Sequence, residues 1–168
     1  MPKFCIDTSG LSHPYENIPE DIHTALWNAV RAMLANGDGA VTKEIFSEIC
    51  LIDGGLGKFV AEQKDKVLFE VGAGQWDWDA YIAHNVRMQD DHKQWISEYT
   101  TKSPKTICLN DLTIIALAKT LGLPVLSMEA SVPENAGSKK RRIPNICKAE
   151  GIEHLTFTDF CRKQKYKF

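Results

Sequence analysis

The sequence contains no long apolar run. None of its 168 residues belongs to a stretch that approaches the roughly 18 apolar residues of a membrane span. The N-terminus, MPKFCIDTSG, has a lysine followed soon by an aspartate, and it lacks the apolar segment of a secretory signal. We therefore expect no membrane association and a cytoplasmic location.

Cysteine pairs at metal-binding or redox spacing are also absent. The cysteines are five in number, scattered, and set mostly among apolar residues, and no CxxC pair occurs. This excludes the usual zinc and thiol-redox motifs and predicts small buried apolar side chains. The five are Cys5, Cys50, Cys108, Cys147 and Cys161.

Glycine-rich phosphate loops of the P-loop or dinucleotide type are missing, since GGLG and GAGQ do not match either pattern. A haloacid-dehalogenase-like phosphatase would carry a second aspartate two residues after Asp7, where this chain has Ser9. A phospho-acceptor receiver domain would carry acidic residues before that aspartate, and KFCI has none. These classes of phosphate chemistry are therefore excluded.

The composition is that of a globular protein, with 43% hydrophobic and 25% charged residues, and the length predicts one domain over residues 1–168. The net charge of -2 is unevenly spread. Residues 139–168 carry nine Lys or Arg and three acidic residues, a net of +6, and the rest of the chain has a net of -8. This asymmetry favours a polyanionic partner, with a solvated basic face as the alternative.

Short apolar runs alternate with segments of helical spacing, which predicts a three-layer, doubly wound α/β fold with a mostly parallel sheet and helices on both faces. Residues 76–100 are expected to form a helical arm packed on the core, and residues 8–10 a turn. The predicted strands are 3–6, 40–41, 67–70, 124–127 and 153–157. The predicted helices are 19–36, 42–53, 56–64, 112–121, 144–150 and one capped by Thr158, and residues 130–142 are expected to form a loop.

Four acidic residues are predicted at strand ends or on helices that a doubly wound fold brings together. Clustered carboxylates repel one another unless a cation joins them, and oxygen ligands select hard ions such as Mg²⁺ or Mn²⁺. Such ions lower the pKa of a bound water and stabilise charge on a phosphoryl group. The sequence therefore predicts phosphodiester hydrolysis by a metal site. Its residues are Asp7, Glu48, Asp111 and Glu129, with Glu44 on the same helix face as Glu48.

The segments FCIDTSGL, VTKEIFSEI and LNDLTIIALAKTLGLPVLSME resemble the three-block pattern of PIN-domain nucleases, including VapC-type toxins. By this resemblance Asp7, Glu48 and Asp111 match the first three acids of the family. Ser9 matches the hydroxyl residue beside the first acid. The final Thr-x-Asp corresponds to Ser127 and Glu129, with Glu in place of Asp. The C-terminal segment KKRRIPNICKAEGIEHLTFTDFCRK resembles the end of a less characterised bacterial PIN-like family.

The resemblance implies cleavage of RNA by a water activated on Mg²⁺ or Mn²⁺. For toxin members it also implies a small antitoxin protein that blocks the site. The sequence leaves open whether the protein forms a homodimer. An acidic pocket repels RNA until metal binds, so cations outside the pocket are expected to hold the RNA backbone. The alternative is a PIN-like RNA- or protein-binding module that does not catalyse. The expected RNA-binding residues are Lys139, Lys140, Arg141, Arg142 and Lys148.

Overall fold

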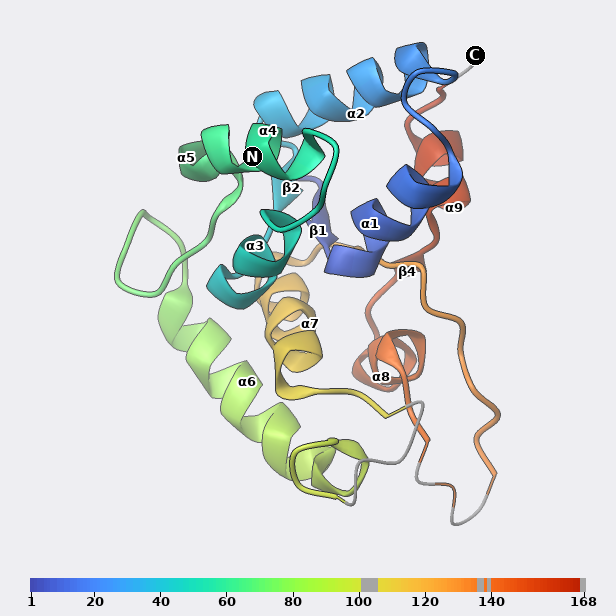
Figure 1. Cartoon of the computed structure of the whole chain (residues 1–168). Helices are drawn as coiled ribbons and strands as arrows, with labels where there is room; N and C mark the ends of the chain where they lie inside the picture. Colours follow the sequence, from blue (N-terminus) through green and yellow to red (C-terminus); the bar gives the residue numbers. More distant parts are fainter. Residues whose placement is uncertain (101–105, 136–137, 139, 167–168) are drawn as a thin grey trace.

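Four short parallel strands form the centre of the computed structural model, which describes residues 1–100, 106–135, 138 and 140–166 (Figure 1). The strand order is β2-β1-β3-β4. In the two central strands, Cys5 pairs with Val125 and Ile6 with Leu126. All strand pairs are parallel, so each connection is a crossover that carries helices. The strands are β1 (Phe4–Ile6), β2 (Gly39–Ala40), β3 (Val125–Leu126) and β4 (His154–Leu155).

Helices cover both faces of the sheet: α2 and α9 lie above it in Figure 1, and α7 and α8 lie below it. This arrangement confirms the predicted three-layer α/β architecture with a parallel sheet. The helices are α1 (Thr8–Asn17), α2 (Thr24–Ala35), α3 (Lys43–Ile49), α4 (Leu56–Glu62), α5 (Lys64–Val67), α6 (Trp78–Asp91), α7 (Leu109–Leu121), α8 (Ile143–Glu150) and α9 (Phe157–Lys163), and Lys93–Trp95 forms a short 3-10 helix, η1.

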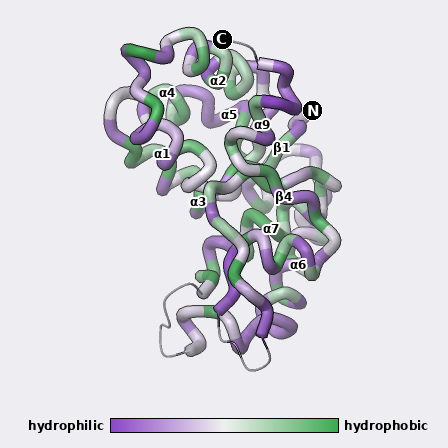
Figure 2. The backbone as a smooth tube through the Cα atoms, turned by 90° about the vertical axis from the view of Figure 1, so that its right-hand side faces the viewer, coloured by the Kyte–Doolittle hydropathy of each residue, from purple (hydrophilic) through white to green (hydrophobic). Residues whose placement is uncertain are grey.

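The core is built around α7, in which residues 112–118 are all buried. A helix that is apolar on every side belongs in the interior, and α7 packs on β1, β3, α3, α6 and α8. In Figure 2, β1 and α7 are coloured mostly as hydrophobic, whereas α6 is largely hydrophilic. The central position of α7 places its N-terminus beside the carboxyl ends of the strands.

The predicted arm corresponds to α6 and η1, and α6 packs along α7. Tyr81 and Met88 are buried in that contact, while Ile82 and Val86 stay exposed. After η1, Ile96 forms an isolated parallel bridge with Ile107. None of the helices in the described part of the chain combines the length and apolar character needed to span a bilayer.

The N-terminal part of the chain differs from the sequence prediction. Residues 8–10, expected as a turn, begin α1, because the Asp7 side chain caps its N-terminus. The helix predicted over residues 19–36 starts only at Thr24. As a result Ile22, which lies before the observed start of the helix, is 72% exposed.

Three further boundaries were wrong. The predicted helix 42–53 ends at Ile49. Residues 67–70, expected as a strand, contribute only an isolated bridge between Val41 and Leu68. The last helix begins after Thr156, not Thr158, because Thr156 forms a capping box with Asp159. The five cysteines are free; Cys5 and Cys147 are buried as predicted, whereas Cys50, Cys108 and Cys161 are only partly buried.

Candidate active site

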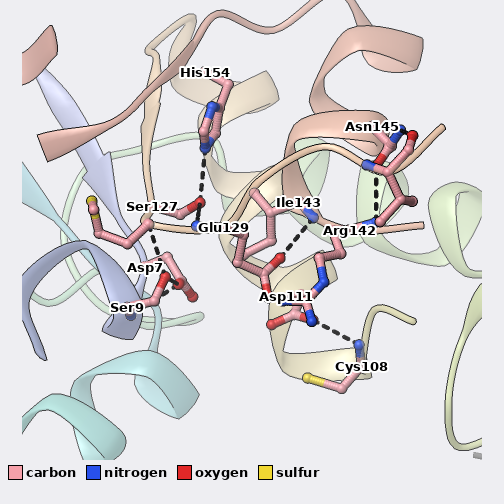
Figure 3. Close-up of polar contacts among 12 residues, drawn as sticks. Asp7, Ser9, Cys108, Asp111, Ser127, Glu129, Arg142, Ile143, Asn145 and His154 are labelled. Atoms are coloured by element: carbon pink, nitrogen blue, oxygen red, sulfur yellow. Dashed lines mark hydrogen bonds and ion pairs between the residues drawn. The ribbon is translucent and has the colours of Figure 1, made fainter. Parts of the chain in front are cut away.

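Asp7 follows β1 directly and is 5% exposed. Its Oδ2 accepts hydrogen bonds from the backbone N of Ser9 (3.0 Å) and from Ser9 Oγ (2.5 Å). Ser9 Oγ in turn accepts a hydrogen bond from the backbone N of Met128 at 3.1 Å (Figure 3). Asp7 is thus held between the N-terminus of α1 and the segment that follows β3.

A glycine allows α1 to approach the end of β3 closely. A Cβ atom added to Gly10 would lie 2.6 Å from the backbone oxygen of Leu126, which is inside any normal contact distance. The same carbonyl accepts the backbone N–H of Asp7 at 2.9 Å. The absence of a side chain at Gly10 therefore helps to bring Asp7 next to the chain that leaves β3.

Asp111 lies in the first turn of α7, where its Oδ2 accepts a hydrogen bond from the backbone N of Cys108 at 2.7 Å. The pKa of Asp111 is raised to about 7, chiefly by burial and in smaller part by the charges of Asp7 and Glu129, against the hydrogen bonds from Cys108. The pKa of Asp7 is raised to about 6, again chiefly by burial, with the Ser9 hydrogen bonds opposing the rise and the charges of Glu129 and Glu48 contributing to it. The charges of Glu129 and Glu48 thus act on Asp7, and those of Asp7 and Glu129 act on Asp111.

Glu48 connects the N-terminal ends of α1 and α7, where Asp7 and Asp111 lie. Its Oε2 accepts a hydrogen bond from Thr8 Oγ1 at 2.6 Å, and its Oε1 accepts one from Asn110 Nδ2 at 2.7 Å. Thr8 follows Asp7, and Asn110 precedes Asp111. The sequence did not predict a role for Thr8 or Asn110. Their positions next to Asp7 and Asp111 were the one signal that could have identified them.

Glu44, predicted to accompany Glu48, lies elsewhere. It is exposed, and its charge acts on Tyr81 of α6 instead. Burial raises the pKa of Tyr81 to about 12, and the charge of Glu44 contributes to that rise. Thus the structure connects Glu48 to the neighbours of Asp7 and Asp111 and leaves Glu44 outside.

Glu129 is held by the N-terminal end of α8. Its Oε1 accepts a hydrogen bond from Arg142 Nη1 at 3.1 Å, and its Oε2 accepts one from the backbone N of Ile143 at 3.0 Å (Figure 3). Ser127 is completely buried; its Oγ lies 2.8 Å from His154 Nε2 and accepts the backbone N–H of Glu129 at 3.3 Å. Ser127 and His154 therefore set the direction in which the chain leaves β3.

The predicted RNA-binding residues do not form one uniform cluster. Arg142 pairs with Glu129, and the guanidinium of Arg141 lies over the ring of Trp95, 4.9 Å from its centroid. Lys140 and Lys148 are exposed. Lys139 lies outside the described residues.

Two depressions in the surface adjoin the acids. One, of about 470 Å³, is lined by Ser9, His13, Met128, Glu129, Ala130, Ser131, Val132 and Arg142. The other, of about 460 Å³, contains Glu48 together with residues from α1 and the segment after α3. We call the first depression the Arg142 cleft.

Within the described residues, no group of three or more His, Cys, Asp or Glu side chains is placed to hold a metal ion. Glu48 and Glu129 each use both carboxylate oxygens for protein hydrogen bonds. By contrast, both hydrogen bonds of the Asp7 carboxylate end on Oδ2, and none from the described residues ends on Oδ1. The donor set, oxygen only and crowded with like charge, fits Mg²⁺ or Mn²⁺ held chiefly by Asp7 and Asp111.

The fold and the site define a three-layer α/β protein with interacting carboxylates at the carboxyl edge of its parallel sheet. Residues 4–168 match a family described as a domain of unknown function (DUF4411), and the chain belongs to that family. The match runs from β1 to the C-terminus and includes every acid of the site. A comparison with curated proteins found no match.

Proposed function

We propose that this protein is a Mg²⁺- or Mn²⁺-dependent endoribonuclease that hydrolyses phosphodiester bonds of RNA. The observation that carries the proposal is the pair of aspartates formed by Asp7, which is buried, and Asp111, which is half-buried; each has a raised pKa to which neighbouring carboxylates contribute. Like charges withdrawn from solvent in this way favour a divalent cation between them. When bound, the cation would activate water and stabilise charge on the phosphoryl group.

The residues of the chain divide the remaining tasks. Asp7 and Asp111 would hold the cation, and Ser9 orients Asp7 through its two hydrogen bonds. Glu48 keeps the N-terminal ends of α1 and α7 together through Thr8 and Asn110, which maintains the spacing of the two aspartates. Support for this arrangement comes from these hydrogen bonds and from the mutual effect of the carboxylates on their pKa values.

RNA as the substrate follows from the resemblance of the sequence to PIN-domain nucleases and from the basic C-terminal part of the chain. Lys139, Lys140, Arg141 and Lys148 would attract the RNA backbone without reading its sequence. The same resemblance makes the protein the toxin of a toxin–antitoxin pair, with a small antitoxin as partner and a homodimer as a further assembly. A cytoplasmic location is part of this proposal, because that is where an RNA substrate would be met.

A second candidate function is a PIN-like module that binds RNA or protein without cleaving it. It is favoured by the engagement of all four oxygens of Glu48 and Glu129 with protein donors. It is also favoured by the lack of a metal-ready group of ligands in the described residues.

Incubation with total RNA and with tRNA, in Mg²⁺, Mn²⁺ or EDTA, separates the two functions. The nuclease cleaves in either metal and not in EDTA, and Asp7→Asn and Asp111→Asn abolish the cleavage. Glu48→Gln reduces it strongly, whereas the matched control Glu44→Gln, on the exposed side of the same helix, leaves it near the parent level. RNA binding without cleavage under any of these conditions supports the second candidate and contradicts the first.

A further inference from the structure

Arg142 is held by one acidic residue, Glu129, and part of its guanidinium remains available to donate further hydrogen bonds. Its Nη1 donates to Glu129 Oε1, and among the described residues no acceptor takes a hydrogen bond from its Nη2 or Nε. The Arg142 and Glu129 side chains are 33% and 21% exposed, so the pair is partly shielded from solvent. A guanidinium held in this way has given up much of its rotational freedom before any ligand arrives.

The Arg142 cleft opens beside the residue that binds the buried Asp7. Ser9, which binds Asp7, lines the cleft together with Glu129 and Arg142. His13, one turn further along α1, is exposed and lines the same cleft. A histidine ring always carries at least one N–H donor, so two elements of the fold bring donors to one cleft: α1 with His13, and the start of α8 with Arg142.

We propose that the Arg142 cleft binds a phosphate of the substrate RNA next to the bond that is cleaved, with Arg142 and His13 as its donors. Glu129 is then a positioning residue that aims Arg142, and not the metal ligand that its place in the sequence predicted. This inference rests on the proposed nuclease function and specifies its substrate contacts.

Charge explains why such a cleft belongs at this site. An RNA phosphate that approaches Asp7 and Asp111 meets their negative field, and a neighbouring cation offsets that repulsion. Arginine suits the task because its planar fork binds phosphate through two parallel hydrogen bonds. Glu129 already satisfies one end of the fork and so leaves Nη2 and Nε for the phosphate. Contacts of this type hold the backbone and read no bases.

RNA binding in EDTA tests the cleft without cleavage. The probe is a short fluorescein-labelled single-stranded RNA, followed by fluorescence anisotropy. Arg142→Gln is expected to weaken binding about tenfold, the usual effect of removing a charged hydrogen bond. His13→Gln weakens it less, about threefold. The matched control is Lys58→Gln, an exposed cation on α4 outside the cleft, which changes binding by less than about twofold. Arg142→Lys keeps the charge without the fork and is expected to fall between.

Metal binding tests the role of Glu129. Calorimetric titration with Mn²⁺ is expected to give Glu129→Gln an affinity within about threefold of the parent, while Asp7→Asn loses most of it. Glu129→Gln should nevertheless bind the labelled RNA about as weakly as Arg142→Gln, because the guanidinium is no longer aimed. Loss of Mn²⁺ binding in Glu129→Gln as severe as in Asp7→Asn overturns the positioning role.

The outcomes separate this inference from the proposed function. If Arg142→Gln binds RNA like the parent and cleaves it in a metal-dependent way, the proposed phosphate-binding cleft is contradicted and the proposed nuclease function is not. If the parent protein binds RNA through Arg142 but neither binds Mn²⁺ nor cleaves RNA, the nuclease function is contradicted and the phosphate-binding cleft is supported. If Arg142→Gln does not fold, as judged by circular dichroism, Arg142→Lys and His13→Gln decide. A cleft that binds an acidic peptide through Arg142, and does not bind the RNA, overturns the assignment to RNA.

Discussion

Replacing Asp7 by asparagine should make the metal-free protein more stable at neutral pH. The pKa of Asp7 rises from 3.8 to about 6, chiefly through burial. A carboxyl whose pKa is higher in the folded than in the unfolded state stabilises the fold while it is protonated. That stability is lost as the pH rises from the unfolded pKa through the folded one. For Asp7 the loss lies between about pH 4 and pH 7 and amounts to about 3 kcal/mol once the group is ionised.

Asparagine has nearly the same shape and carries no charge, so this loss does not occur in Asp7→Asn. The variant gives up part of the N-cap of α1, because a neutral amide oxygen accepts the Ser9 hydrogen bonds more weakly, at a cost of about 1 kcal/mol. The net gain is about 2 kcal/mol above pH 7, which corresponds to a rise of about 4–8 °C in Tm for a chain of this length. Near pH 4, where the aspartate is protonated, the gain disappears or reverses.

The assay is thermal unfolding followed by circular dichroism, in EDTA, for the parent and Asp7→Asn across this pH range. Added Mg²⁺ or Mn²⁺ should raise the Tm of the parent and have little effect on the variant, because a cation that binds only the folded state stabilises it. If Asp7→Asn is no more stable than the parent at pH 8 in EDTA, then the ionised Asp7 carboxylate does not destabilise the metal-free fold.

Three other predictions test neighbouring parts of the molecule. Asp111→Asn, at a residue whose pKa is about 7, should also raise the Tm in EDTA near pH 8 while abolishing metal-dependent cleavage; a stable variant with full cleavage would contradict the site. Gly10→Ala should lower the free energy of unfolding by about 1–3 kcal/mol in urea titrations, because its Cβ would press on the Leu126 carbonyl; unchanged stability would mean that α1 can shift freely. Alanine at all four positions of the basic loop should weaken binding to unrelated RNAs without changing the affinity for Mn²⁺. The salt dependence of RNA binding should also become flatter, by about 0.7 in log–log slope for each phosphate of a single strand that the loop no longer binds. Binding identical to that of the parent at every salt concentration would mean that the loop is only a solvated basic face. These four are Lys139, Lys140, Arg141 and Arg142.

Local patterns were enough to predict the general architecture. Short buried strands that alternate with helices leave a parallel α/β sheet as the simplest way to bury both faces of the strands. The same patterns predicted Asp7 at the end of β1, Asp111 in the first turn of α7, and Glu129 just beyond β3. These positions depend on nearest neighbours in the chain, and for that reason they could be predicted from the sequence.

Helix α1 shows where local patterns fail. Its apolar periodicity is weak, and it contains Gly10 and Pro14, which sequence rules associate with turns. The helix forms because Asp7 caps it and because Gly10 lets it pack against the end of β3. Packing against another element therefore outweighs intrinsic propensity here.

The sequence by itself determined which side chains carry charge, which stretches are buried, and the order in which the acids meet the edge of the sheet. Only the tertiary structure decided their partners. Glu48 binds Asn110, which is 62 residues away, and Glu129 binds Arg142 across a 13-residue separation, while Glu44 turns to α6. Each pairing depends on how crossovers and loops bring distant segments together, and a carboxylate has no local preference between an amide, a guanidinium and a metal ion. The choice is made by whichever donor the fold places within hydrogen-bond distance.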